Sequence, residues 1–183
     1  DHVVEVACRA AEIFRKERNI VTVPAPCVAV GDIHGQFQDL KYNILKNGGE
    51  FGDSRYLFLG DYVEHGDESI LCVALLLTAK ILHPDKVFLI RGNHESRQTN
   101  CIYGFLAECK TRFPQNNGQQ PANEPTDPFQ MMNGEHPIWT HFNEVFDSLP
   151  ISAIIDGKIF CVHGGLSPSA ESLEQVLAVK RHT

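Results

Sequence analysis

The sequence predicts an α/β protein in which a parallel sheet is covered on both faces. Short apolar segments at residues 27–30, 56–59 and 87–90 have the length of buried strands, and a glycine follows each within two residues. Longer segments with apolar residues at helical spacing separate these strands. Strands that alternate with helices in this way are typical of a parallel sheet.

The remaining elements follow from periodicity and from residues that end helices. Residues 1–18 place Val3, Ala7, Ala11 and Phe14 at helical spacing, and Pro24 and Pro26 then break the pattern. Further helices are predicted at residues 37–47, 68–82, 100–112, 138–148 and 170–179. Residues 151–155 and 158–162 flank Asp156-Gly157, which predicts a hairpin with a tight primed turn.

Length and composition limit the classes of protein to which the chain can belong. Its 183 residues suffice for one domain with a substantial core, predicted to span residues 1–183. A formal charge of −7 argues against nucleic acid as a partner, and the longest apolar run, near residues 70–77, is too short to cross a membrane. The six cysteines form no C-x-x-C pair, so we expect reduced thiols and a cytoplasmic and/or nuclear location.

Residues 114–137 differ in character from the rest of the chain. They carry five prolines and show little apolar periodicity. A loop insertion on the surface of the domain is predicted there.

Polar residues flanked by glycines follow four of the predicted strands. The clusters are Gly31-Asp32-Ile33-His34-Gly35, Gly60-Asp61-Tyr62, Gly92-Asn93-His94-Glu95 and His163-Gly164-Gly165. Because the carboxyl ends of parallel strands line one crevice, we expect these clusters to converge there. One such cluster alone would be read as a helix cap, but four at successive strand ends favour a shared site. Glu95 alone stays ambiguous between serving the site and capping the following helix.

The residue types in these clusters indicate a metal site. They comprise two aspartates, an asparagine and three histidines, and no cysteine. Carboxylate, imidazole and amide oxygen suit Mn, Fe or Zn ions. Five or more ligands are too many for one tetrahedral ion, so two ions bridged by a carboxylate are predicted.

Five segments together resemble the phosphoprotein phosphatase family of metal-dependent Ser/Thr phosphatases. They are GDIHGQ (31–36), LFLGDYV (57–63), LIRGNHES (89–96), YGFLAECK (103–110) and IFCVHGGLSP (159–168). The resemblance implies the metallophosphoesterase fold, also called calcineurin-like, which is a β-sandwich flanked by helices. It also implies hydrolysis of phosphoserine and phosphothreonine, with phosphoprotein substrates and regulatory subunits as partners.

The resemblance assigns a role to each residue that matches a family motif. The implied metal ligands are Asp32 and His34 for the first ion, Asp61 for both ions, and Asn93 and His163 for the second. His94 matches the general acid that protonates the leaving serine or threonine oxygen, while a metal-bridging water attacks phosphorus.

Two substitutions and the end of the chain depart from the family pattern. Glu64 replaces the aspartate that orients the general acid, and we expect it to reach His94 if the backbone adjusts. His65 replaces the arginine that grips the substrate phosphate, and loss of one transition-state donor costs about 2.7–4 kcal/mol. The chain ends at Thr183, before the family's catalytic domain ends, so a fold incomplete at the C-terminus is expected.

These departures leave two other functions open. One is a degenerate or truncated pseudophosphatase that captures phosphoproteins or regulatory subunits without turnover. The other is a phosphoesterase for nucleotides or small phosphates, which the GDYV and LSP segments disfavour.

Overall fold

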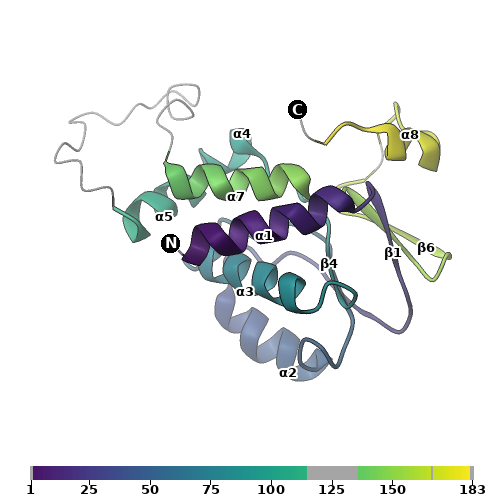
Figure 1. Ribbon diagram of the computed structural model, residues 1–183, viewed down its shortest axis with the longest axis horizontal. Helices are drawn as coiled ribbons and strands as arrows, with labels where there is room; N and C mark the ends of the chain where they lie inside the picture. The colour runs from purple at the N-terminus through teal and green to yellow at the C-terminus, as the bar shows by residue number, and fades with distance from the viewer. Residues whose placement is uncertain (1, 115–135, 166, 182–183) are drawn as a thin grey trace.

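The computed structural model describes residues 2–114, 136–165 and 167–181 (Figure 1). Its first sheet contains the three strands predicted from the apolar segments: β2 (Val28–Val30), β3 (Tyr56–Phe58) and β4 (Val87–Leu89). All neighbours in this sheet are parallel, in the order β2-β3-β4. The parallel sheet predicted from the sequence is therefore confirmed.

A second sheet adds a strand that the sequence pattern did not reveal. Strand β1 (Ile20–Val23) pairs in parallel with β5 (Ser152–Ile155), which pairs antiparallel with β6 (Ile159–Val162). Between β5 and β6, Asp156 and Gly157 have φ of 51° and 67°, as the predicted primed turn requires. The sequence pattern did not reveal β1, because this strand has only four residues and gains its partner from far along the chain.

The two sheets pack face to face through apolar side chains from both. This cluster consists of Val21, Val23, Leu57, Phe88, Ile90 and Ala153. The arrangement is the sandwich implied by the family resemblance.

Helices cover the other face of the β2-β3-β4 sheet. Helix α1 (His2–Lys16) lies beside α3 (Ser69–Leu82) and α7 (Pro137–Ser148), as Figure 1 shows. Their shared core contains large side chains with almost no exposed surface, including Phe14, Leu76, Trp139 and Phe146. This core fixes the sheet whose strand ends carry the polar clusters.

Two predicted helices have a different form in the structure. The helix expected after Phe37 begins as a π-helix, η1 (Asp39–Ile44), and continues as α2 (Leu45–Gly48). The helix expected at residues 100–112 is divided into α4 (Arg97–Asn100) and α5 (Phe105–Arg112). Gly104 separates them with φ of 123°, a conformation that interrupts a right-handed helix.

The C-terminal part contains one short helix, α8 (Leu173–Ala178), which begins at a capping box formed by Ser172 and Gln175. Residues 115–135 of the predicted loop insertion lie outside the described residues. All six cysteines are free thiols. Among the described residues, every helix is too short or too polar to cross a membrane.

Candidate metal centre and active site

The structure brings the four polar clusters together at one edge of the two sheets. Asp61, which follows β3, lies at their centre, and its side chain is only 5% exposed. Its Oδ2 atom is 3.5 Å from His34 Nε2 and 3.3 Å from His163 Nε2. Its Oδ1 atom accepts a hydrogen bond of 3.0 Å from the backbone N–H of His94. One carboxylate oxygen is thus held in place, while the other faces two imidazoles.

Backbone carbonyl groups orient both of these imidazoles. Nδ1 of His34 lies 2.8 Å from the carbonyl oxygen of Val63, and Nδ1 of His163 lies 2.9 Å from that of Leu59. A carbonyl oxygen can only accept, so each Nδ1 carries a proton and Nε2 is the nitrogen that faces the site. Histidines that bind metal ions are oriented in this manner.

Two more oxygen donors flank Asp61. Asn93 Oδ1 is 2.9 Å from His163 Nε2, and Asp32 Oδ2 is 3.8 Å from His34 Nε2. Asp32 is half-exposed, so this side of the site is open to solvent. The four other sequence-predicted ligands therefore lie in one group with Asp61.

The donor chemistry fits bound cations. Nε2 of His163 faces the oxygens of Asn93 and Asp61. Nε2 of His34 faces the oxygens of Asp61 and Asp32 in the same way. A cation between these nitrogen and oxygen atoms would take them as ligands. Asp32, His34 and Asp61 together form a group that could hold a metal ion.

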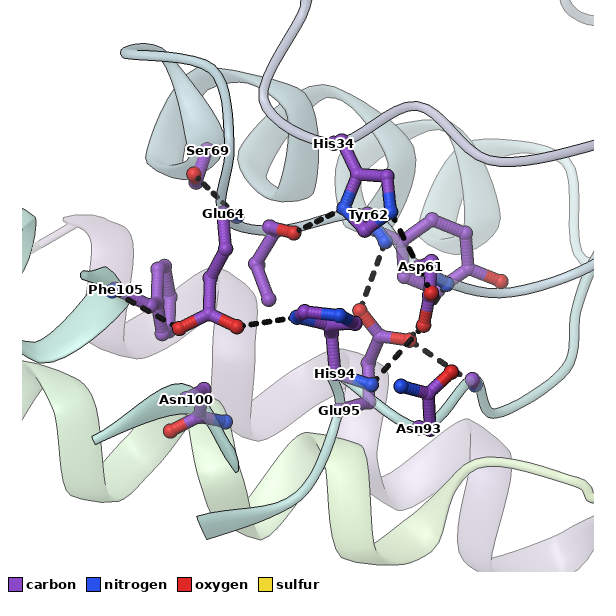
Figure 2. Close-up of polar contacts among 12 residues, drawn as sticks. His34, Asp61, Tyr62, Glu64, Ser69, Asn93, His94, Glu95, Asn100 and Phe105 are labelled. Atoms are coloured by element: carbon purple, nitrogen blue, oxygen red, sulfur yellow. Dashed lines mark hydrogen bonds and ion pairs between the residues drawn. The ribbon is translucent and has the colours of Figure 1, made fainter. Parts of the chain in front are cut away.

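A buried carboxylate contacts the histidine next to this centre (Figure 2). Glu64 Oε2 is 2.5 Å from His94 Nδ1, and Glu64 Oε1 accepts a hydrogen bond from the backbone N–H of Phe105. Glu64 is 2% exposed, and burial raises its pKa while the hydrogen bond from His94 opposes the rise. The longer glutamate arm therefore makes the contact that was expected of it.

The backbone adopts a rare conformation where this contact is made. Glu64 and His65 have φ of 73° and 62°, in the left-handed region that non-glycine residues seldom occupy. The turn is held because Glu64 N–H donates to Ser69 Oγ and Gly66 N–H donates to the His34 carbonyl. Such strained turns are common at functional sites.

His65 lies exposed beside His34, which is partly buried, and His94, which is buried. Its ring centre is 4.5 Å from that of His34 and 5.1 Å from that of His94. The nearby Arg91 and Arg97 instead form ion pairs with Asp147 on α7. These two ion pairs therefore hold the segment that follows β4 against α7.

Glu95 is the site residue whose role the sequence left ambiguous. Its carboxylate accepts hydrogen bonds from the backbone N–H groups of Asp61, Tyr62 and Gly92, at 2.8, 2.8 and 3.0 Å. It is fully buried, and burial raises its pKa to about 7 against the opposing effect of these donors. Glu95 therefore joins the loop after β3 to the loop after β4, instead of capping the following helix.

Gly92 permits the close approach of these two loops. A Cβ atom at this position would clash with the backbone nitrogen and Oδ1 of Asp61, and it would lie 2.7 Å from Glu95 Oε2. The glycine is needed because the loop carrying Asn93 passes directly against Asp61.

Comparison with known proteins agrees with this geometry. The model of the calcineurin-like phosphoesterase family matches residues 25–183. A structure of a protein serine/threonine phosphatase from Saccharomyces cerevisiae, with similarity to human phosphatase PP5, is 34% identical with a TM-score of 0.81. The match covers 100% of this chain and 53% of the yeast chain.

A more distant match has the same fold. The structure of a cold-active protein-tyrosine phosphatase from a psychrophilic Shewanella species is 18% identical, with a TM-score of 0.52, and the match covers 85% of this chain and 46% of that one. This chain thus spans about half the length of both phosphatases. The family match over most of the sequence and the sandwich of two sheets agree with the resemblance seen in the motifs. The chain belongs to the calcineurin-like phosphoesterase family.

Proposed function

We propose that this chain hydrolyses phosphoserine and phosphothreonine in proteins, as a metal-dependent phosphoric monoester hydrolase. The observation that carries the proposal is the position of Asp61 Oδ2 between two imidazole Nε2 atoms, with the Glu64–His94 pair beside it. The similarity to a yeast serine/threonine phosphatase supports the substrate class. The presence of all five proposed metal ligands and of His94 favours an enzyme over a phosphoprotein-binding module without turnover.

The proposed metal ligands divide into two sets around Asp61. Asp32 and His34 would hold one ion, Asn93 and His163 would hold the other, and Asp61 would contact both. Mn, Fe and Zn ions suit this donor set. Two such ions, when bound, lower the pKa of water and neutralise charge on the phosphate oxygens.

His94 is proposed as the general acid. Its Nδ1–H donates to the buried carboxylate of Glu64, so Nε2 is the nitrogen that can hold and deliver a proton. Transfer of that proton to the leaving serine or threonine oxygen would leave a neutral imidazole, still oriented by Glu64. Glu64 is thus a positioning residue, and it also stabilises the charged imidazolium.

His65 is proposed to contact the substrate phosphate where related phosphatases have arginine. Its exposed ring lies beside His34 and His94. An imidazole cannot form the two parallel hydrogen bonds of a guanidinium group, so weaker phosphate binding is expected.

The substrate class can be tested with phosphopeptides. The 183-residue chain with added Mn²⁺ should release phosphate faster from phosphoserine and phosphothreonine peptides than from a phosphotyrosine peptide of the same sequence. A metal chelator should abolish the release from all three. A preference for phosphotyrosine, or turnover of nucleotides alone, would contradict the proposal.

A further inference from the structure

We infer that His34, His65 and His94 form a site for one zinc ion, which shares His34 with the two-ion centre around Asp61 and competes with that centre. Each of the three offers a ring nitrogen, and these atoms all lie within 4.8 Å of one another. The three rings also pack mutually, with centres 4.5 to 5.1 Å apart. None of the proposed roles of these residues in hydrolysis requires this three-histidine arrangement.

Two of the three histidines are already prepared for metal binding. The Nδ1–H of His34 donates to the Val63 carbonyl at 2.8 Å, and that of His94 donates to Glu64 Oε2 at 2.5 Å. A carbonyl or carboxylate behind the ring is the usual partner of a zinc-bound histidine, since it fixes the tautomer and makes the other nitrogen a better ligand. Both Nε2 atoms are therefore available as ligands.

His65 supplies the third ligand from an exposed position. A tetrahedral zinc ion with Zn–N bonds of about 2.0–2.1 Å needs its ligand nitrogens about 3.4 Å apart, which is closer than the 4.8 Å limit here. The ring of His65 is solvent-exposed, so we expect it to turn toward His34 and His94 when an ion binds. The cluster depends on His65, because an arginine at this position would offer no lone pair.

The ligand type selects the ion. Three neutral imidazoles with a water as the fourth ligand form a tetrahedral site that suits Zn²⁺, whereas Mg²⁺ and Mn²⁺ favour oxygen donors. Zinc in the three-histidine site would occupy Nε2 of His94 and withdraw Nε2 of His34 from Asp61. If the chain has the proposed function, zinc bound to these three histidines would therefore inhibit hydrolysis. The binding of zinc does not itself depend on that function.

The test compares zinc affinity in a chain whose two-ion centre is weakened by Asp61→Asn. Zinc titration against a coloured chelator should show tight binding to the Asp61→Asn chain and at least about tenfold weaker binding to Asp61→Asn/His65→Asn. Asparagine suits the left-handed backbone at position 65, so the second change should not disturb folding. Circular dichroism checks that both chains are folded.

A matched control removes a histidine elsewhere. Asp61→Asn/His141→Asn changes an imidazole on α7, which contacts Glu144, and should bind zinc as the Asp61→Asn chain does. Co²⁺ gives an independent readout. The intense visible absorption of Co²⁺ in a tetrahedral site should be lost in the variant that carries only His65→Asn. Equal zinc affinity with and without His65, or no tight zinc binding by the folded Asp61→Asn chain, would overturn the proposal.

Discussion

Replacing His94 with asparagine is expected to slow the hydrolysis of phosphoserine by about 10²–10⁴-fold, the usual contribution of general acid catalysis. Asparagine retains the backbone N–H that donates to Asp61 Oδ1, so the metal ligands should keep their places. The side chain, however, can no longer deliver a proton to the leaving oxygen. The values of kcat/KM for a phosphoserine peptide and for nitrophenyl phosphate measure this effect.

The leaving group distinguishes a lost acid from a damaged site. Nitrophenolate leaves without being protonated, so the loss with nitrophenyl phosphate should be much smaller than the loss with phosphoserine. His141→Asn serves as the matched control and should leave both rates unchanged. Equal losses on the two substrates would show that His94 does not act as the acid.

Glu64 provides a companion variant for the same assay. Glu64→Gln removes the buried charge but keeps a side chain of the same length beside His94. The decrease in kcat/KM caused by Glu64→Gln should be smaller than the decrease caused by His94→Asn. It should show the same dependence on the leaving group. Because the two residues act as a unit, the double variant should lose little more than His94→Asn alone.

Replacing Glu95 with alanine is expected to lower the free energy of unfolding by at least about 3 kcal/mol. The change leaves the buried N–H groups of Asp61, Tyr62 and Gly92 without their acceptor, and each unsatisfied donor costs about 1–3 kcal/mol. Denaturant unfolding measures the loss directly. The same variant should retain metal ions more weakly, since Asp61 is no longer held against the Asn93 loop.

Two controls separate this effect from the loss of a carboxylate in general. Glu12→Ala removes an exposed carboxylate from α1 and should change stability by less than about 0.5 kcal/mol. Glu95→Gln keeps the side-chain volume but places the amide N–H group of glutamine against a backbone N–H donor. This variant should therefore also destabilise the protein. A Glu95→Ala chain as stable as the Glu12→Ala chain would contradict the role assigned to Glu95.

Elements with strong local signals were predictable from the sequence. The strands before Gly31, Gly60 and Gly92 were recognisable because a parallel sheet covered on both faces requires short, apolar strands. Strand β1 was not, since its four residues gain their hydrogen bonds from β5, far along the chain. The η1 π-helix and the interruption at Gly104 depend on tertiary packing and on a single φ value, so periodicity could not show them.

The convergence of the ligands that follow β2, β3 and β4 was likewise predictable, because parallel strands present their carboxyl ends together. His163 follows β6, an antiparallel strand of the other sheet, so this rule does not explain its position. The contacts that hold these ligands in position could not be predicted from the sequence. Glu95 gave no sequence signal that distinguished a helix cap from three buried backbone hydrogen bonds. The carbonyl groups that orient His34 and His163 are backbone atoms, and their identity follows only from the folded loops.

The most direct test of the account is the hydrolysis of nitrophenyl phosphate by the purified 183-residue chain with added Mn²⁺, compared with its Asp61→Asn variant. Asp61 faces both imidazoles, so its loss should weaken both ion sites at once. The account predicts Mn²⁺-dependent turnover that falls at least about 10³-fold in the variant, equal to about 4 kcal/mol of transition-state stabilisation. Turnover that survives Asp61→Asn, or none from a folded chain that has bound Mn²⁺, would contradict it.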